Sequence, residues 1–320
     1  MKDKRIRLII TLAVILVLID AVFIIFFLNP DGFGRAGYNP EVNPSDFIDE
    51  IDNKYFTLTP GKKMIYEAKI EGKTERTEVY VMNETRMVYG VETRVVWDRV
   101  WLDGELIEDT KDWYAQNKNG DVWYFGEDTK ELIDGKIVTT KGSWEAGVDG
   151  AKPGIIMKGN PVIGDSYRQE YYAGIVEDSG KIVALNESVS VPFGSFTGCV
   201  KTFDWTPIEP GITENKYYCP GMGGVALEAH IQDNERVELI LVEYDSEPTP
   251  STEAEQFTPE ITEQEAREIA LREVSGTITD VAIEKKFGKL AYVVEILTSN
   301  GVETDVIIDT ETGEILGVET

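Results

Sequence analysis

The residues that could bind a ligand gather in one aromatic stretch, residues 112–128, which reads DWYAQNKNGDVWYFGED. Its NKNGD segment has Asn and Gly in the order of a calcium-binding EF-hand loop. The first ligand position of such a loop would be Ala115 and the twelfth Gly126, where the motif needs Asp and Glu. The stretch therefore predicts a hairpin that turns at Asn119-Gly120, and it does not indicate a calcium site.

Two predicted hairpins place aromatic and charged side chains on one face of a three-strand meander. With Asp103-Gly104 and Asn119-Gly120 as two-residue turns, Arg99 lies opposite Glu108. Because side chains alternate along a strand, one face then carries the candidate ligand-facing residues Trp97, Arg99, Trp101, Glu108, Tyr114, Trp123 and Phe125. Aromatic walls with a few polar groups suit a small-molecule pocket. A packed core with one ion pair at its rim is the alternative, and both interpretations stay open.

Catalytic motifs are absent from the sequence. A single histidine, His230, excludes an H-E-x-x-H metalloprotease, and no nucleophile elbow or phosphate-binding glycine loop occurs. Two cysteines and one histidine are too few for a zinc site. We expect no metal, no cofactor and no enzyme activity; a two-carboxylate hydrolase ranks last, because 58 acidic residues make close pairs inevitable. Asn83 and Asn186 head the sequons NET and NES, which are candidate glycosylation sites.

The two cysteines, Cys199 and Cys219, flank a turn signal, TPIEPG, centred near residue 209. A hairpin that folds there sets the two thiols opposite each other. In an oxidising compartment this arrangement predicts a cross-strand disulfide. Two reduced, buried thiols are the alternative.

The elements that must position these residues begin with an apolar run at 8–28, LIITLAVILVLIDAVFIIFFL. Its length as a helix matches a bilayer core of about 30 Å. Basic residues fill the segment 1–7, so the positive-inside rule places that tail in the cytoplasm and the bulk of the chain outside. We expect a retained single-pass anchor in the cell membrane, because no cleavage site follows the run. Whether Asp20 pairs within the membrane stays open.

The region 53–244 follows a Gly- and Pro-rich spacer at 29–52. Short alternating runs of β-branched and aromatic residues fill it, broken by turn pairs such as Asp134-Gly135. They predict an antiparallel β sandwich or open barrel. Residues 245–258 are rich in Pro, Ser, Thr and Glu and predict a linker. The net charge of -27 argues against a nucleic-acid partner.

The segment 259–320 predicts one helix and a small antiparallel sheet. Thr262 and Glu265 form a capping box, and the helix should end at Gly276. An apolar stripe at helical spacing lies between them: Ala266, Ile269, Ala270 and Val274. Three strand-like runs follow, the last two joined by Asn300-Gly301.

This C-terminal segment resembles a PepSY domain. The likeness rests on the opening ITEQEAREIAL, the Tyr-centred AYVVEI and the closing VIIDTETGEIL. It implies an α+β module found outside the cytoplasm, in pro-regions of metallopeptidases and in bacterial envelope proteins, for which inhibition of peptidases has been proposed. Stretches of the β region, such as YFTLTPGKKMIYEA, resemble a recurring family of secreted or membrane-anchored prokaryotic proteins, a likeness that implies no particular chemistry.

The patterns combine into a mainly β protein: an N-terminal transmembrane helix, a β sandwich or open barrel, and an α+β PepSY domain with one helix on three strands. We expect extracytoplasmic binding or regulation, with the PepSY domain engaging a peptidase or another envelope protein. The alternative is an envelope carrier or sensor that holds a small apolar or amphipathic ligand in the β domain.

Overall fold

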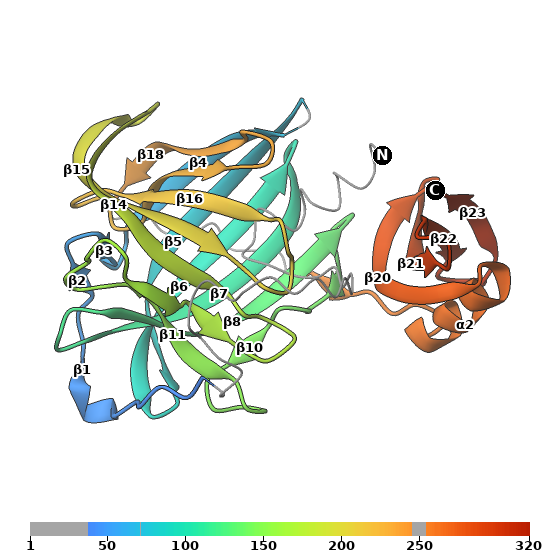
Figure 1. Ribbon diagram of the computed structural model, residues 1–320, viewed down its shortest axis with the longest axis horizontal. Helices are drawn as coiled ribbons and strands as arrows, with labels where there is room; N and C mark the ends of the chain where they lie inside the picture. The colour runs from blue at the N-terminus through green and yellow to red at the C-terminus, as the bar shows by residue number, and fades with distance from the viewer. Residues whose placement is uncertain (1–37, 71, 245–253) are drawn as a thin grey trace. The chain divides into compact units, whose positions relative to one another are not determined.

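The computed structural model describes residues 38–70, 72–244 and 254–320 (Figure 1). The predicted tail at 1–7 and anchor at 8–28 lie outside the described residues. Among the residues that are described, no helix is both long enough and apolar enough to span a membrane. The described chain divides into two compact units, which we call the β unit (38–130 and 140–244) and the C-terminal unit (131–139 and 254–320).

The β unit begins with a short 3-10 turn, η1 (Pro44–Asp46), and is otherwise built from strands. In chain order these strands are β1 (Phe47–Ile48), β2 (Asp52–Asn53), β3 (Phe56–Thr57), β4 (Lys63–Ile70), β5 (Lys73–Val88), β6 (Val91–Leu102), β7 (Glu105–Asn117), β8 (Val122–Ile133), β10 (Trp144–Glu145), β11 (Lys152–Met157), β12 (Ser166–Arg168), β13 (Glu170–Tyr171), β14 (Ser179–Val191), β15 (Gly194–Trp205), β16 (Thr213–Tyr218), β17 (Val225–His230) and β18 (Arg236–Glu243). The prediction of a mainly β fold is confirmed.

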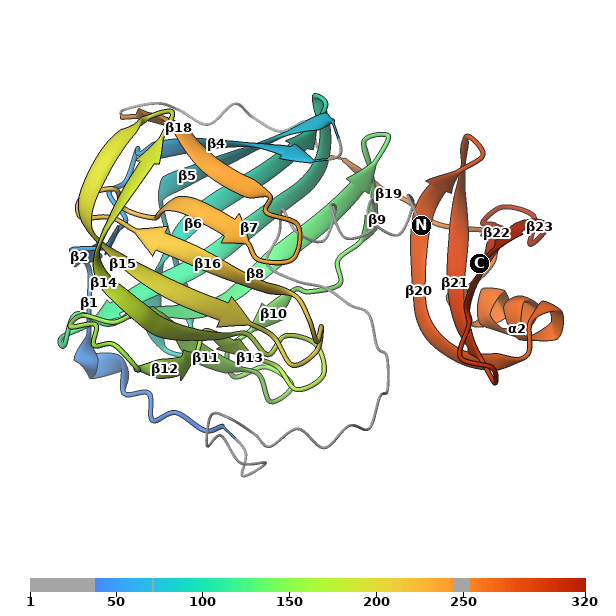
Figure 2. The ribbon, with the colours of Figure 1, turned by 45° about the horizontal axis from the view of Figure 1, so that its top comes forward.

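The strand pairings of the β unit form a circuit. Neighbours in the chain pair from β4 to β8, and β8 pairs with β11. From β11 the circuit passes through β13 and β12, which are consecutive in the chain, to β14. It continues through β15, β16 and β17 to β18, which pairs back with β4. The two runs of long strands face each other in a sandwich-like layout (Figures 1 and 2).

Two-residue turns close several of the hairpins, as the sequence predicts. Asp103 (φ 50°) and Gly104 (φ 88°) join β6 to β7 in the left-handed conformation that such turns require. The turn at Asn119-Gly120 differs from the prediction. The N–H of Asn117 donates to the carbonyl of Asp121 at 2.9 Å, so three residues, 118–120, form this loop.

A β-bulge corrects the predicted register between β6 and β7. Trp101 lies opposite Leu106 as expected, but the next pair is Val100 with Glu108, so Ile107 is an extra residue in β7. Arg99 consequently lies opposite Asp109, and the predicted pairing of Arg99 with Glu108 is wrong. Because side chains alternate with a period of two, this one-residue shift moves the side chains of β7 to the opposite face from the one predicted.

The folded unit also begins earlier than the predicted boundary at residue 53. Within the predicted spacer 29–52, Phe47 on β1 packs its ring against Trp123 and Phe125, with ring centroids 6.1 and 5.4 Å apart. The hydroxyl of Tyr38 donates to the carbonyl of Pro153 at 3.0 Å. Residues 38–52 are therefore part of the β unit.

The predicted disulfide between Cys199 and Cys219 is confirmed. The two Cα atoms lie 4.2 Å apart, next to the paired residues Val200 on β15 and Tyr218 on β16. Both cysteines are fully buried in an apolar cluster that also contains Met64 of β4. The bond therefore links neighbouring strands directly beside the interior of the unit.

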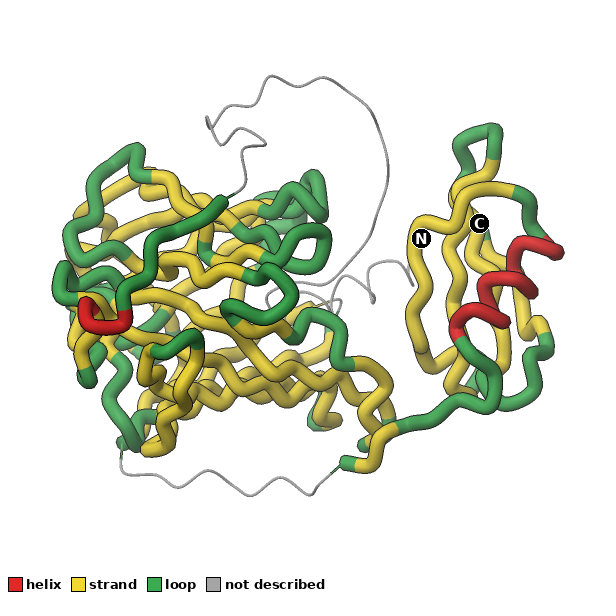
Figure 3. Tube along the Cα trace, turned by 90° about the horizontal axis from the view of Figure 1, so that it is seen from below, coloured by secondary structure: helices red, strands yellow, loops and turns green. Residues whose placement is uncertain are grey.

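The C-terminal unit contains one helix, α2 (Glu263–Glu273), and it is the one α-helix of the described chain (Figure 3). The Thr262 and Glu265 capping box forms as predicted, and the helix ends before Gly276 because Val274 is its C-cap. The sheet has four strands where the sequence predicts three. In spatial order they are β20 (Gly276–Lys286), β21 (Lys289–Thr298), β22 (Glu303–Asp309) and β23 (Ile315–Glu319). The apolar stripe of α2 packs on this sheet, with Ala266 and Ala270 fully buried.

Two further short strands belong to the C-terminal unit. They are β9 (Lys136–Thr139) and β19 (Glu255–Gln256), which pair in parallel. Residues 245–253 of the predicted linker lie outside the described residues. The end of that linker, at 255–256, is in strand conformation.

Candidate functional site

The interior of the β unit contains a cavity of about 200 Å³ that is partly open. Side chains from both runs of strands line it, including Val79 of β5, Asp98 of β6, Tyr114 of β7 and Lys216 of β16. The cavity is therefore a product of the whole circuit and cannot be assigned to one motif.

The lining of the cavity changes from apolar to acidic along the strands. The inward positions of β5 run from Val79 through Thr77 to Glu75, and those of β16 run from Tyr218 through Lys216 to Glu214. Strand pairing aligns the two gradients. Glu228 of β17 pairs with Val237 of β18, and Glu75 of β5 pairs with Ala68 of β4. Because β18 and β4 are paired neighbours, Glu228 and Glu75 lie in one row across the sheet. On β5 and β16, one end of the cavity is apolar and the other acidic. Two further acids, Asp98 and Asp112, reach the apolar end, because they pair with Val79 and Val96.

Aromatic and aliphatic side chains form the apolar end. Its members are Phe56, Leu58, Met64, Tyr66, Val79, Val96, Tyr114, Ile156, Tyr218 and Val225. Tyr114 stacks on Tyr124 with ring centroids 4.7 Å apart, which makes this wall rigid. Such a surface suits the hydrocarbon part of a ligand and has few hydrogen-bonding groups.

Several carboxylate oxygens of the residues that line the cavity are buried without a hydrogen-bond partner. They are Glu75 Oε2, Asp98 Oδ1, Asp178 Oδ1 and Asp204 Oδ1. The side chains are deeply buried, since Glu75 is 1%, Asp204 3% and Asp178 6% exposed. A buried polar atom without a partner costs roughly 1–3 kcal/mol, so each of these atoms needs an explanation.

Burial changes the protonation of these acids. Loss of solvent raises the pKa of Glu75 to about 8, with the nearby Glu228 carboxylate adding to the rise. Burial also raises the pKa of Asp98 well above its usual range, and the neighbouring Asp112 and Glu75 reinforce the effect. Exclusion of water makes a carboxyl group harder to ionise. Acids with pKa values shifted in this way are common at functional sites.

A pair of carboxyl groups shares one tyrosine beside the cavity. The hydroxyl of Tyr124 lies 2.6 Å from Asp112 Oδ1 and 2.7 Å from Glu127 Oε2. A hydroxyl has one hydrogen and can donate to one of these oxygens; the other contact requires a proton on the carboxyl. Burial raises the pKa of both acids, which fits one shared proton on the pair. Glu170 and Asp178 form a second buried pair of acids, in direct hydrogen-bond contact with each other, and burial raises the pKa of both.

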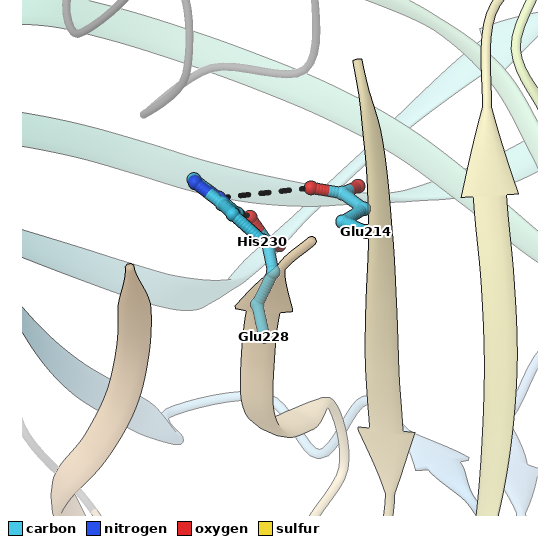
Figure 4. A group of neighbouring side chains, drawn as sticks. All are labelled: Glu214, Glu228 and His230. Atoms are coloured by element: carbon cyan, nitrogen blue, oxygen red, sulfur yellow. Dashed lines mark hydrogen bonds and ion pairs between the residues drawn. The ribbon is translucent and has the colours of Figure 1, made fainter. Parts of the chain in front are cut away.

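A third group of charges combines two acids with two cations on β16 and β17. Figure 4 shows three of its members, Glu214, Glu228 and His230. The Nε2 atom of His230 lies 3.0 Å from Glu228 and 3.8 Å from Glu214. Lys216 Nζ lies 2.7 Å from Glu214 and 3.6 Å from Glu228. Burial alone would lower the pKa of His230, but the hydrogen bond and charge of Glu228, helped by Glu214, raise it to about 9. The imidazole is therefore charged at neutral pH.

The same side chains contain donor atoms for a metal ion. Glu214, Glu228 and His230 place one ligand atom each within 4.8 Å of one another, and so do His230, Asp233 and Glu235. Lys216 already supplies positive charge at the first group, and its ammonium would repel a bound cation. We therefore assign this group as an ion network in which a proton on His230 takes the place of a metal.

The structure separates the candidate ligand-facing residues that the sequence predicted. Tyr114 lines the cavity, and Glu108 is buried on the same inner face of β7, where it accepts a hydrogen bond from Thr110. Trp123 and Phe125 of β8 pack against Phe47.

The three predicted residues of β6 lie together on its other face. The Arg99 guanidinium lies over the rings of Trp97 and Trp101, 4.2 and 5.1 Å from their centroids. Arg99 also lies 3.8 Å from Glu78, and the indole of Trp97 donates to Asp109 at 2.9 Å. This cluster has its own partners, and none of its members lines the cavity.

The predicted glycosylation sites lie on the strands. Asn83 follows Met82 on β5 and is exposed, and Asn186 (φ 61°) is an exposed residue at a register shift of β14. Both side chains are accessible to solvent. Modification of either one stays a prediction.

Sequence reasoning missed the acids of the cavity. Glu75 lies in the strand segment KTERTEVYV, where Arg76 and Glu78 alternate with Glu75 and Thr77, so polar residues occupy both faces. A pattern of this kind does not indicate which face is buried. The one signal in the sequence was the excess of acids over bases, which did not say where they gather.

Comparison with known proteins identifies the C-terminal segment. The family model described as peptidase propeptide and YPEB domain, PepSY, matches residues 260–319. The chain carries a C-terminal PepSY domain. Helix α2 and strands β20 to β23 all lie within this PepSY domain, and the match leaves the β unit without an assignment.

A curated protein matches a stretch of the chain of about the same length. The uncharacterized protein YkoJ of Bacillus subtilis (strain 168) is 39% identical over 59 residues. The match covers 18% of this chain and 35% of YkoJ, so the chain spans about a third of the length of that relative.

Two solved structures match a larger share of the chain at low similarity. The crystal structure of MucB has a TM-score of 0.28 and 9% identity, and the match covers 78% of this chain and 74% of MucB. The complex structure of Pseudomonas aeruginosa MucA/MucB has a TM-score of 0.30 and 10% identity, covering 80% and 77%. At these scores, the likeness supports no conclusion about a ligand or partner.

Proposed function

We propose that the β unit is an extracytoplasmic binding module that holds a small amphiphilic ligand in its interior. The cavity carries this proposal, because its wall changes from apolar to acidic over the length of the same strands. Apolar walls with a few convergent polar groups are the usual construction of a ligand pocket. A core that served stability alone would fill this space with apolar side chains.

The size of the cavity limits the ligand. About 200 Å³ is less than the roughly 300–1,000 Å³ that drug-sized ligands occupy. We therefore expect a ligand with a short hydrocarbon or aromatic body and one polar group. A long-chain lipid would extend beyond the enclosed space.

The proposed location outside the cytoplasm has two supports. One is the Cys199–Cys219 disulfide, since such bonds persist in oxidising compartments. The other is the predicted anchor at 8–28, which would hold the chain at the cell membrane with its tail inside.

Native mass spectrometry of the full chain tests the binding proposal. The protein is purified from its own envelope in lipid nanodiscs and released by collisional activation in the gas phase. We expect an adduct of one small molecule per chain, lost in a variant that fills the apolar end, Val79→Trp. A chain that never carries an adduct and never binds an amphiphile added in solution would contradict the proposal.

We propose as a second function that the PepSY domain regulates a peptidase or another envelope protein. The family description, which names peptidase propeptides, favours this function. In the four-stranded sheet, β23 is a terminal strand, to which a partner could add a strand of its own. Cross-linking of the full chain and of a chain without residues 259–320 tests it. Capture of the same peptidase by both chains would rule the idea out.

A further inference from the structure

The charges around the cavity do not balance. Eight of the lining residues carry a carboxyl group: Glu75, Asp98, Asp112, Asp178, Asp204, Glu209, Glu214 and Glu228. Lys216 is the one basic residue among the lining residues. The cavity therefore repels anions and attracts cations, provided that some of these acids ionise.

The ammonium of Lys216 is already engaged. It lies 2.7 Å from Glu214, 3.6 Å from Glu228 and 3.8 Å from Asp204. Among the described residues, no Lys, Arg or His side chain lies within ion-pair distance of Glu75, Asp98 or Asp178. None of these three acids therefore forms an ion pair within the described part of the chain. His230, Arg99 and Lys216 act on the charges of Glu75, Asp98 and Asp178 only from a longer distance.

The unpaired oxygens described above require hydrogen-bond donors. Glu75 Oε2, Asp98 Oδ1, Asp178 Oδ1 and Asp204 Oδ1 come from four different segments of the chain and are buried without a hydrogen bond. A protonated amine supplies three N–H donors and one positive charge in a small volume. Hydrogen bonds of this kind, between a cation and a carboxylate, are about twice as strong as neutral ones.

We propose that the cavity selects a small amphiphilic amine, with its ammonium group beside Glu75 and Asp204 and its hydrocarbon body against the apolar end. This inference rests on the proposed binding function and names the chemical class of the ligand. The alternative is that the carboxyl groups stay protonated and act as donors to a neutral or anionic ligand. The two cases differ in which head group the cavity prefers.

Three probes of equal chain length separate these cases: n-hexylammonium, 1-hexanol and hexanoate. Their binding to the full chain in lipid nanodiscs is measured by calorimetry at pH 7.5, with protein-free nanodiscs as the blank. We expect hexylammonium to bind at least about tenfold more tightly than hexanol, and hexanoate to bind most weakly. Equal affinity of hexanol and hexylammonium, or tighter binding of hexanoate, would overturn the inference and leave the proposed function intact. Binding of none of the three would count against both.

Variants assign the preference to the acidic end. Glu75→Gln removes one ionisable oxygen with little change of shape, and Asp204→Asn is an independent second variant should the first fold poorly. Each should weaken hexylammonium about tenfold and leave hexanol unchanged. The matched control is Glu84→Gln, an exposed residue on the same strand β5, which should change neither affinity. Equal losses for hexylammonium and hexanol would mean that Glu75 only supports the fold, and the inference would fail.

Discussion

The β unit and the PepSY domain enclose their interiors in opposite ways. In the PepSY domain, α2 covers a four-stranded sheet, and the residues between them are aliphatic, such as Ile296, Val306 and Ile308, all fully buried. In the β unit, the facing runs of strands enclose acids together with aromatic side chains. Apolar burial stabilises a fold at about 25 cal/mol per Å², whereas a buried acid costs free energy unless it is paired. The difference fits a PepSY interior that serves stability and agrees with the binding function that we propose for the β interior.

The largest expected effect comes from the PepSY core. Replacing the fully buried Ile296 by Ala should destabilise this domain by about 3–4 kcal/mol, because the cavity left behind cannot refill. Hydrogen exchange followed by mass spectrometry measures the loss of protection separately for each unit. Hexylammonium affinity should not change. The control Val318→Ala, at a residue that is 45% exposed on β23, should stay within about 0.5 kcal/mol.

The ion network of the β unit should come second. His230→Gln leaves Glu214 and Glu228 without the imidazolium between them, and we expect a loss of roughly 2–3 kcal/mol at pH 7. The pKa of His230 is about 9 in the folded chain, above its unfolded value. The contribution of His230 is therefore complete below about pH 6.5 and disappears as the pH rises through 9. Urea unfolding at pH 6, 8 and 10 checks this trend.

A neighbouring surface variant provides the contrast for His230. Ile231 follows it in the chain and is 46% exposed, so Ile231→Ala should cost less than about 0.5 kcal/mol at every pH. A pH-independent loss in His230→Gln, equal at pH 6 and pH 10, would contradict the assigned charge.

A smaller effect of opposite sign is expected at the acidic end. The pKa of Glu75 is raised to about 8, above the usual value near 4.5, so the folded chain binds a proton there that the unfolded chain releases. The stability that this residue contributes is present at low pH and is lost as the pH rises towards 8. Glu75→Gln should thus stabilise the ligand-free protein by about 1–2 kcal/mol at pH 8 and by much less at pH 5.

Thermal unfolding at the two pH values measures this gain. The charges of Glu228, Glu235 and His230 act on Glu75, so the wild type and the variant are compared at each pH. Glu84→Gln should show no gain. Destabilisation of the Glu75 variant at pH 8 would mean that the acid supports the fold in its ionised form.

The smallest expected effect is at the start of α2. Thr262→Ala removes the capping interaction with the N–H of Glu265, and we expect a loss of about 1 kcal/mol, confined to the PepSY domain. Exchange rates of the amides in α2 report it. Gln264→Ala, an exposed change in the same turn, serves as the control. An equal loss in the control would refute the role of the cap.

Local patterns predicted much of the fold. The apolar stripe and the capping box identified α2, because both are properties of neighbouring residues in one helix. The turn signal between Cys199 and Cys219 identified their disulfide for the same reason. The strand β23 was missed, since ILGVE is short and follows Glu314 without a turn pair.

The candidate site could not be predicted to the same extent. Its walls come from strands far apart in the chain, and the pairing of β18 with β4 that encloses them leaves no local pattern. The bulge at Ile107 has no signal either, because nothing in GELIED marks an extra residue. For this reason the predicted ligand-facing group joined residues of two different faces.

The bulge at Ile107 also bears on how such a pocket can diverge. With one residue removed from β7, the inward row that includes Asp112 and Tyr114 would exchange places with the outward row that includes Lys111. The lining of the cavity would change across a whole strand in a single genetic event, without any substitution. Among descendants of this fold, insertions and deletions in β7 should therefore track changes of ligand more closely than replacements of individual residues do.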